Sequence, residues 1–235
     1  MAAIRTARER AREELTREIK AEARRQMGVA GAQQLSLRAV ARELGMVSSA
    51  LYRYFPSRDD LLTALIIDAY NSLGDQVEDA VAAVPAADTR ARWIVLCDAT
   101  RSWAIANPHE YALIYGTPVP GYTAPPETVP PAARVPLLMI ATFADTVGRF
   151  QLEAAPRPVR GLLAQQMADL AATVAPDLNP VLLARGLAAW AQIFGLISFE
   201  LFGQFVGSAE PADALFRYSV EDLADHLGLG PAADH

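Results

Sequence analysis

The sequence predicts an all-α protein. Apolar residues recur every three to four positions through most of the chain, which is the spacing of one helix face. No segment keeps the two-residue alternation of a β-strand, and prolines stand near the starts of most predicted helices, where a missing N–H is tolerated. Apolar residues make up 52% of the 235 positions. That share excludes an intrinsically disordered chain.

Charge divides the chain into two parts. Residues 1–60 carry 12 basic side chains against 8 acidic ones, whereas residues 61–235 carry 9 against 19. The overall net charge of −6 therefore describes neither part. A basic N-terminal segment and an acidic remainder indicate two units with different partners.

The first predicted helix covers residues 5–27. Its apolar positions form one narrow stripe on an otherwise charged surface: Leu15, Ile19, Ala23 and Met27. Gly28 and Gly31 are predicted to end it.

Two short helices and one long helix follow. The short ones are predicted at residues 36–44, with Ser36 as N-cap, and at about 48–54. Ser57 is expected to cap the long helix, which Pro85 ends. Two aspartates in its first turn complement the helix dipole.

The rest of the chain is also predicted to be helical. Helices are expected at about 88–106, 108–114, 132–153, 158–174, 180–206 and 211–227. Residues 116–136 hold seven of the sixteen prolines and are predicted to form a long loop, which is typical of a functional or mobile segment.

Composition also excludes several kinds of chemistry. Cys97 is the only cysteine, so no intramolecular disulfide is possible and a reducing, cytoplasmic location is expected. No His/Cys cluster has metal-ligand spacing, and no paired acid and base or phosphate loop is evident. We therefore expect no catalytic residues, no metal and no cofactor. The N-terminus lacks the apolar run of a signal peptide.

Residues 186–209 are apolar enough to raise the possibility of a membrane span. Glycines and glutamines dilute the segment, and Glu200 interrupts it. A helix buried in a core or subunit interface is the better interpretation, so no membrane partner is expected. Glu200 then needs a buried partner or a polar rim, and a structural ion pair is favoured over a ligand contact.

Residues 36–55 carry the motif with a recognisable chemistry. Ala41 lies four residues before Gly45, where a small side chain lets a second helix approach closely. Gly45 supplies the left-handed backbone of a tight turn, and Leu51 packs the pair together. This spacing is that of a DNA-binding helix-turn-helix.

The second short helix has the composition of a DNA reader. Small side chains at Ser48, Ser49 and Ala50 allow close approach to base edges, while the side chains that follow can reach phosphates or bases: Tyr52, Arg53 and Tyr54. A plain helical hairpin is the alternative interpretation. The surrounding basic segment favours DNA binding.

The stretch from Leu35 to Leu65 resembles the DNA-binding domain of the TetR family of bacterial transcriptional regulators, above all in its Leu-Tyr-x-Tyr-Phe sequence. The resemblance implies an all-helical homodimer that binds a palindromic double-stranded operator and responds to an effector. It also implies DNA-contacting roles for nine residues: Ser36, Arg38, Ser48, Ser49, Ala50, Tyr52, Arg53, Tyr54 and Arg58. Arg58 is expected to anchor a phosphate at a helix N-terminus.

The acidic part offers weaker signals. Residues 93–122 and 190–204 resemble the C-terminal domain of one branch of that family, above all from Trp103 to Tyr122 and from Trp190 to Glu200. Aromatic residues gather here, and the first choices for an apolar ligand pocket are Trp103, Tyr111, Tyr115, Trp190 and Phe194. Core packing is the alternative for each of them. Cys97 is expected to be inert packing.

The sequence thus predicts a helix-turn-helix domain at residues 1–60, continuing into a connecting helix at 57–84, and an effector-binding and dimerisation domain at 61–230. Dimerisation is expected through the helices at about 158–174 and 180–206. The favoured function is a repressor released from its operator by a small apolar effector. The alternative is a ligand-independent regulator or activator that acts through protein partners.

Overall fold

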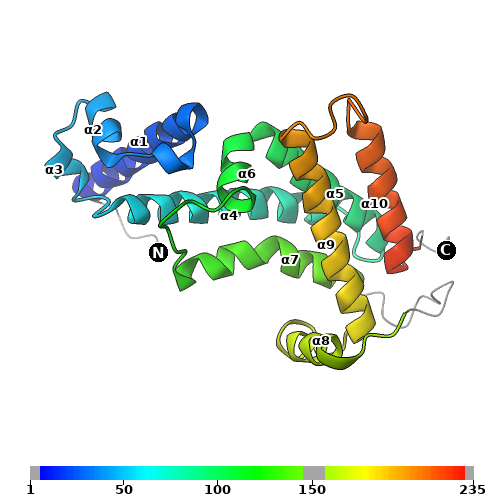
Figure 1. The fold of residues 1–235 in the computed structure, drawn as a ribbon. Coiled ribbons are helices and arrows are strands. Elements are labelled where there is room, and N and C mark those ends of the chain that lie inside the picture. Colours follow the sequence, from blue (N-terminus) through cyan, green and yellow to red (C-terminus); the bar gives the residue numbers. More distant parts are fainter. Residues whose placement is uncertain (1–5, 145–156, 231–235) are drawn as a thin grey trace. The chain divides into compact units, whose positions relative to one another are not determined.

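The structure, a computed structural model, describes residues 6–144 and 157–230 (Figure 1), and the side chains at 143 and 144 are not described. Every regular element in these residues is helical, which confirms the predicted all-α class. The α-helices are α1 (Ala7–Ala30), α2 (Leu37–Glu43), α3 (Ser48–Leu51), α4 (Arg58–Ala82), α5 (Thr89–Ala106), α6 (Pro108–Tyr115), α7 (Val129–Ala144), α8 (Gly161–Val174), α9 (Pro180–Leu201) and α10 (Asp213–Leu227). Two 3₁₀ turns, η1 (Ala32–Gln34) and η2 (Pro126–Thr128), complete the order.

The chain forms two compact units. The head unit comprises residues 1–70 and 107–129, and the body unit comprises residues 71–106 and 130–235. Helix α4 contributes its first part to the head and its second part to the body. The head unit therefore includes α6 and the proline-rich segment after it, in addition to the N-terminal helices. Compactness does not establish which residues carry each function, so the functional boundary at residue 60 stays a prediction.

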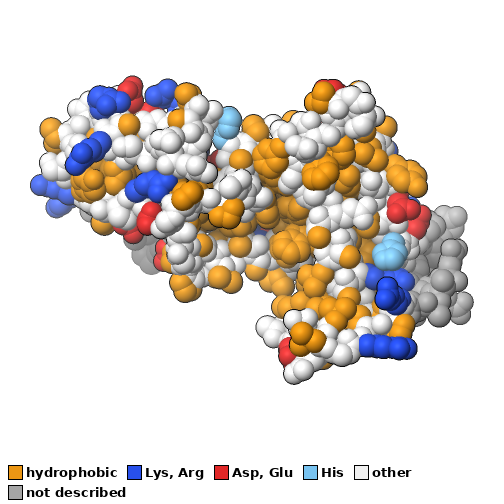
Figure 2. Space-filling model, viewed as in Figure 1, with side chains coloured by type: hydrophobic (Ala, Val, Ile, Leu, Met, Phe, Trp, Pro, Cys, Tyr) orange, Lys and Arg blue, Asp and Glu red, His pale blue; other side chains and the backbone are white. Residues whose placement is uncertain are grey.

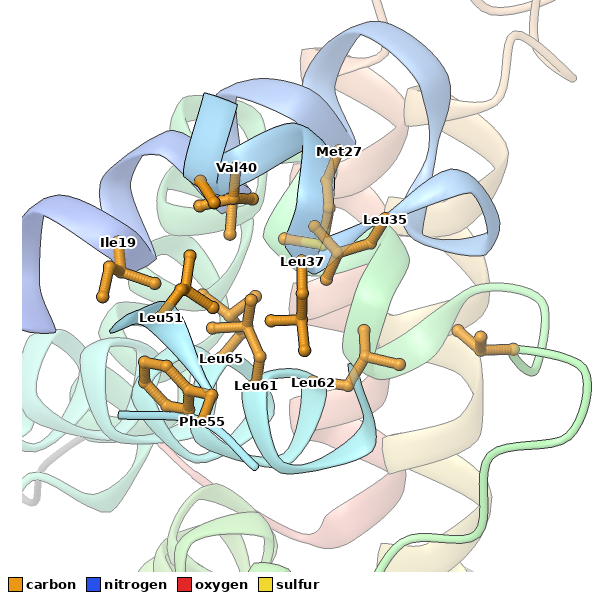
Figure 3. Packing of buried hydrophobic residues seen from close by; sticks show 13 residues of the cluster. Ile19, Met27, Leu35, Leu37, Val40, Leu51, Phe55, Leu61, Leu62 and Leu65 are labelled. Carbon is orange, nitrogen blue, oxygen red and sulfur yellow. The ribbon is translucent and has the colours of Figure 1, made fainter. Parts of the chain in front are cut away.

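The head unit has a core of its own (Figure 3). The stripe predicted on the first helix lies inside it, with Ile19, Ala23 and Met27 all buried. The close-up shows further core side chains from α2, α3, α4 and the segments just before α2 and α4 pointing toward the same centre: Leu35, Leu37, Val40, Leu51, Phe55, Leu61, Leu62 and Leu65. Burial of a side chain of this size contributes about 1.5–3 kcal/mol, so the short helices are held by packing more than by their own propensity.

Helix α1 shows one correction to the sequence prediction. Thr6 caps it in a capping box with Glu9. The helix passes through Gly28 and ends only at Gly31, where φ is +79°, so the predicted stop at Gly28 is wrong. A Cβ at Gly28 would lie 3.1 Å from Cδ2 of His109 on α6. Gly28 thus lets His109 of α6 pack closely against α1, and it does not end the helix.

Two further boundaries differ from the prediction. Helix α7 begins at Val129, well inside the predicted 116–136 loop, because prolines in a first helical turn need no N–H donor. The end of the predicted 132–153 helix lies outside the described residues. Helix α9 ends at Leu201 rather than at 206, since the chain reaches a left-handed conformation at Gly203, with φ +74°.

The body unit packs α5, α8 and α10 against α9. Trp93 is fully buried, and its Nε1 donates a 2.9 Å hydrogen bond to the carbonyl of Val220 on α10. Cys97, one turn further along α5, is also buried, as expected for a packing residue, and burial raises the pKa of its thiol.

Helix α9 is long and apolar enough to span a membrane by length and composition alone. A core helix of a soluble protein passes the same test. Ile193 and Ile197 are fully buried. Glu200 accepts two hydrogen bonds from Arg101 of α5, at 2.6 and 2.7 Å. The predicted structural ion pair is therefore confirmed, and α9 is a packed helix of the body unit.

Candidate nucleic-acid interface

Helices α2 and α3 meet in a tight left-handed turn. Gly45 has φ +65°, as the sequence predicted. The amide of Met46 donates to the carbonyl of Ala41 at 2.8 Å, which closes the turn. Ala41 is fully buried, so the small side chain lies where the two helices come together. These contacts make the helix pair one rigid unit.

Helix α3 is shorter than the predicted 48–54 segment. Four residues are α-helical, and the chain continues as hydrogen-bonded turns: the amides of Arg53 and Tyr54 donate to the carbonyls of Ala50 and Leu51 at 3.2 and 2.8 Å. Leu51 is fully buried and anchors this segment in the head core. The residues beyond it depend on tertiary contacts for their orientation.

The surface of α3 is open to a partner. Ser49 is exposed, Ser48 and Ala50 are half-buried, and all three side chains are small. Val47, immediately before them, is 70% exposed and is a surface residue that the sequence pattern did not indicate. Tyr52 is 42% exposed. A helix end of this kind presents hydroxyl donors and apolar groups, which is the chemistry that reads base edges and thymine methyl groups.

Ser36 and Arg38 lie at the start of α2. Ser36 occupies the N-cap position, as predicted, but its side chain makes no capping hydrogen bond. Arg38 is exposed. Both side chains are therefore accessible at a helix N-terminus, where backbone amides also favour an anion.

Arg58 is held by the protein itself. Its Nε donates to the carbonyl of Leu35 at 3.1 Å, and its Nη2 donates to the carbonyls of Ala32 and Gln33 at 3.0 and 3.1 Å. These bonds satisfy carbonyls around η1 and tie α4 to the start of the helix-turn-helix. Sequence reasoning missed this structural role, because the three carbonyls are more than 20 positions away in the chain. The phosphate contact stays a prediction.

The segment before Arg58 confirms a predicted cap. The amide of Asp60 donates to Oγ of Ser57 at 3.1 Å, and the same hydroxyl donates to the Asp60 carboxylate at 2.7 Å. This reciprocal pair fixes the start of α4.

Many cations of the head unit are neutralised within it. On α1, Arg25 pairs with Glu22 at 2.7 Å and lowers the pKa of that carboxyl, while Lys20 and Arg24 both bind Asp68 at 2.8 Å. By contrast, no carboxylate among the described residues pairs with Arg38 or Arg53. Figure 2 shows Lys and Arg side chains over α1–α3. The positive charge left for a partner thus includes the arginines of the helix-turn-helix.

Tyr54 has a partner that sequence reasoning missed. The guanidinium carbon of Arg12, on α1, lies 5.0 Å from the centroid of the Tyr54 ring. Arg12 Nη2 also donates to the carbonyl of Arg53 at 3.4 Å. The two residues that form this hydrogen bond are 41 positions apart, and no local pattern predicts such a contact.

The five predicted pocket residues are divided between the two units. Tyr111 and Tyr115 belong to the head unit, where their ring centroids are 5.3 Å apart; Tyr111 is fully buried. Burial raises the pKa of the Tyr115 hydroxyl far above its ordinary value.

The other three lie in the body unit. Trp103 is buried, and its Nε1 donates to Oγ of Ser72 at 3.0 Å. The rings of Trp190 and Phe194 meet edge to face at 6.0 Å. The described residues contain no group of His, Cys, Asp and Glu that could hold a metal. These five residues stay predictions as ligand contacts.

These features define a helix-turn-helix DNA-binding protein. They are a rigid helix pair joined by a left-handed turn, a short second helix with small exposed side chains, and two arginines, Arg38 and Arg53, that pair with no described carboxylate. Known proteins agree. The family described as bacterial regulatory proteins, tetR family, matches residues 19–65, and the tetracyclin repressor-like C-terminal domain matches residues 93–223. The chain belongs to the TetR family of transcription regulators.

Individual relatives cover nearly the whole chain. The HTH-type transcriptional regulator Rv1816 of Mycobacterium tuberculosis is 37% identical over 229 residues, which are 92% of this chain and 95% of that protein. The crystal structure of a regulatory protein named SCO4313 is 37% identical, with a TM-score of 0.76, over 93% of this chain and 98% of that one. A protein of unknown function from Rhodococcus sp. RHA1 shares the fold at 24% identity and a TM-score of 0.65, over 93% and 95% of the two chains.

Proposed function

We propose that this DNA-binding regulator is a cytoplasmic homodimer that represses transcription from a palindromic operator and is released by a small apolar effector. The observation that carries the proposal is the exposed surface of α3. This surface combines small side chains with accessible hydroxyls, and it belongs to a helix pair that the head core holds in place. It also carries Arg53, which pairs with no described carboxylate.

The proposed contacts follow from the chemistry of each side chain. Ser48, Ser49 and Ala50 meet base edges, because their size lets the backbone come close. The hydroxyls of Tyr52 and Tyr54 bind phosphates, and Arg53 binds a base or a phosphate. Ser36 and Arg38 hold the phosphates beside α2, with the helix N-terminus contributing amide donors. Arg58 has a smaller part, since Nε and Nη2 already bind carbonyls.

Helix α6 supports a route from an effector to the DNA-binding surface. Within the head unit, Glu110 of α6 binds Nε of Arg24 on α1 at 2.7 Å. The hydroxyl of Tyr70 on α4 donates to the carbonyl of Ile114 at 3.3 Å. A ligand that shifts α6 therefore pulls on both α1 and α4. Tyr111 and Tyr115 are the proposed ligand contacts within the head unit, and Trp103, Trp190 and Phe194 are the proposed contacts within the body unit. The effector is expected to be largely apolar.

The dimer is proposed to form through α8 and α9, by analogy with the family. Leu162 and Leu163 on α8 and Phe199 on α9 are exposed in the single chain. Helix α9 also carries small residues on exposed positions, including Ala188 and Ala191, which allow another helix to approach closely. Exposed apolar side chains on adjacent helices are typical of an interface.

The alternative is a regulator that needs no small ligand. The two proposals differ in one measurement, which is whether any compound that stabilises the protein also weakens its binding to DNA. Thermal-shift screening of lipophilic compounds finds such molecules, because a ligand of the folded state raises its stability by mass action.

The DNA-binding contacts can be tested by mobility shift on the DNA beside the chain's own gene. Wild-type protein should prefer one palindromic site over random DNA at moderate salt. Arg53→Ala should weaken that binding by about 1–3 kcal/mol, and Tyr52→Phe by less, because the phenol hydroxyl is a single contact. Neither variant should lower the melting temperature. A wild-type protein without sequence preference would contradict the proposal.

A further inference from the structure

The C-terminal half of the reading segment is not part of an α-helix. Helix α3 ends at Leu51, and Tyr52, Arg53 and Tyr54 lie in the turns that follow. Leu51 and Phe55 are buried on either side of them. These anchors fix the path of the chain but not the direction of the exposed side chains between them.

One side chain from outside the motif contacts this turn. Arg12 places its guanidinium carbon 5.0 Å from the centroid of the Tyr54 ring, and its Nη2 donates to the Arg53 carbonyl at 3.4 Å. The flat, forked guanidinium can stack on a ring and donate hydrogen bonds at the same time, which a lysine ammonium cannot. Both contacts reach the segment that carries the proposed phosphate and base contacts.

The surroundings of Arg12 make the contact notable. Helix α1 carries five glutamates, yet no carboxylate among the described residues pairs with Arg12. Its neighbours on the same helix behave differently: Arg17 pairs with Glu14, and Arg25 with Glu22. Arg12 thus contacts the reading segment, whereas Arg17 and Arg25 bind carboxylates, and Arg25 also lies 3.9 Å from Glu43 of α2.

We propose that Arg12 is a positioning residue for DNA recognition: it holds the Tyr54 ring and the Arg53 backbone so that the reading side chains are ordered before DNA binds. The proposal rests on the assignment of the α3 segment as the DNA contact. Ordering side chains in advance lowers the entropy that binding must spend. The 3.4 Å hydrogen bond to the Arg53 carbonyl is long, so Arg12 acts chiefly through Tyr54, and it need not touch the duplex.

Two other roles make different predictions. A direct phosphate contact by Arg12 would lower the slope of log K against log salt by about one when the charge is removed. A merely structural contact would lower the melting temperature and would weaken specific and non-specific binding alike. A positioning role weakens specific binding, leaves the salt slope in place and disappears when Tyr54 is removed.

The experiment uses the full-length chain and a duplex that the wild-type protein selects from a random-sequence pool. Four variants are compared at several salt concentrations: Arg12→Ala, Arg12→Lys, Tyr54→Leu and the double variant Arg12→Ala/Tyr54→Leu. Arg10→Ala is the matched control, because it removes the same charge from an exposed position on the same helix. Melting temperature and affinity for random DNA are measured alongside.

Arg12→Ala is expected to weaken specific binding about threefold to tenfold, the range of an exposed cation–π contact plus a hydrogen bond. Its melting temperature, salt slope and affinity for random DNA should match the wild type. Arg12→Lys should not restore specificity, since it keeps only the charge. In the Tyr54→Leu background, Arg12→Ala should cost little more, whereas Arg10→Ala should behave the same in both backgrounds.

Additive losses from Arg12→Ala and Tyr54→Leu would overturn the proposal, as would a reduced salt slope, full rescue by Arg12→Lys or an unchanged specific affinity. A wild-type chain that selects no sequence from the pool would overturn the DNA-reading assignment, and the Arg12 proposal with it. If the wild type selects a sequence and the Arg12→Ala variant binds that sequence equally well, only the Arg12 proposal is overturned.

Discussion

In the head unit, Arg38 and Arg53 stand on the helix-turn-helix without a carboxylate partner among the described residues, whereas arginines of the body unit are held by acids. Arg101 binds Glu200 with both branches of its fork, and Arg134 binds Asp75 and Glu78 at 2.6 and 2.7 Å. Arginine therefore has two uses in this chain. Arg101 and Arg134 join helices of the body, whereas Arg38 and Arg53 of the head are left for a partner.

Some of the excess acidic side chains of residues 61–235 bind the arginines that join helices. Arg134 on α7 also donates to the carbonyl and side-chain oxygens of Asn71 on α4, both at 3.1 Å. A Cβ at Gly74 would lie 2.7 Å from that guanidinium, so the glycine makes room for it. Asp75 and Glu78 thus join α4 to α7 through Arg134. The remaining negative charge is expected to repel DNA.

The largest effect is expected where an arginine of the body is removed. Arg101→Ala leaves the mostly buried Glu200 carboxylate without its bidentate partner and uncovers the Phe216 ring, 5.1 Å from the guanidinium. We expect a loss of about 2–3 kcal/mol in the free energy of unfolding, somewhat below the cost at a fully buried pair. Urea denaturation measures it.

The control for this change is Arg217→Ala, also in the body. Arg217 is exposed and lies 3.9 Å from Asp98, so its loss should change stability by less than about 0.5 kcal/mol. Equal costs for the two variants would refute the view that the body arginines join helices.

The second-largest effect tests whether residues 107–129 help to stabilise the head unit. Tyr122 follows α6, and its hydroxyl is 2.9 Å from that of Thr63 on α4, which is buried. Tyr122→Phe leaves that threonine without its partner and should cost about 1 kcal/mol. Amide exchange in α2 should accelerate about fivefold, while exchange in α10 stays constant.

Tyr218→Phe is the matched control, because Tyr218 is exposed on α10. It should change neither exchange rate. If Tyr122→Phe instead accelerated exchange in α10 and spared α2, residues 107–129 would not be an energetic part of the head.

The two units also show which features can be predicted from sequence and which cannot. The turn at Gly45 and the Ser57–Asp60 cap were predictable, because each depends on residues within a few positions of one another. The helix periodicity was predictable for the same reason. Local patterns specify local conformation.

Apart from misplaced helix ends, what the sequence did not predict involves contacts between distant residues. Gly28 reads as a helix stop, yet it accommodates His109 from α6. Val119, in the proline-rich segment, packs in the core of the head unit, and no local pattern indicates this contact. Arg12 and Arg58 bind backbone carbonyls far away in the chain, which the sequence also does not indicate. Such pairings depend on the tertiary fold, which one sequence does not reveal.

The smallest effect is a pH dependence in the body unit. Hydrogen bonding to Arg134 lowers the pKa of Glu78 below its ordinary value. A carboxyl whose pKa is lower in the folded than in the unfolded state stabilises the fold above the unfolded value, and that contribution is lost as the pH falls through the folded pKa. Glu78→Gln removes the titration. The wild type should therefore exceed the variant in stability near neutral pH, and the difference should shrink toward about pH 4 and below.

The difference at neutral pH is expected to be only about 0.5 kcal/mol, since Glu78 is 44% exposed and solvent screens its ion pair. Urea midpoints for both proteins at several pH values measure it. The Arg134→Gln background supplies the control, because it removes the cause of the lowered pKa; there the same substitution should give a difference that no longer shrinks on acidification. If the stability difference shrank equally in both backgrounds, Arg134 would not be the group that keeps Glu78 charged. Arg134 would then not join α4 to α7 through this ion pair, and its contrast with the unpaired Arg38 and Arg53 would fail.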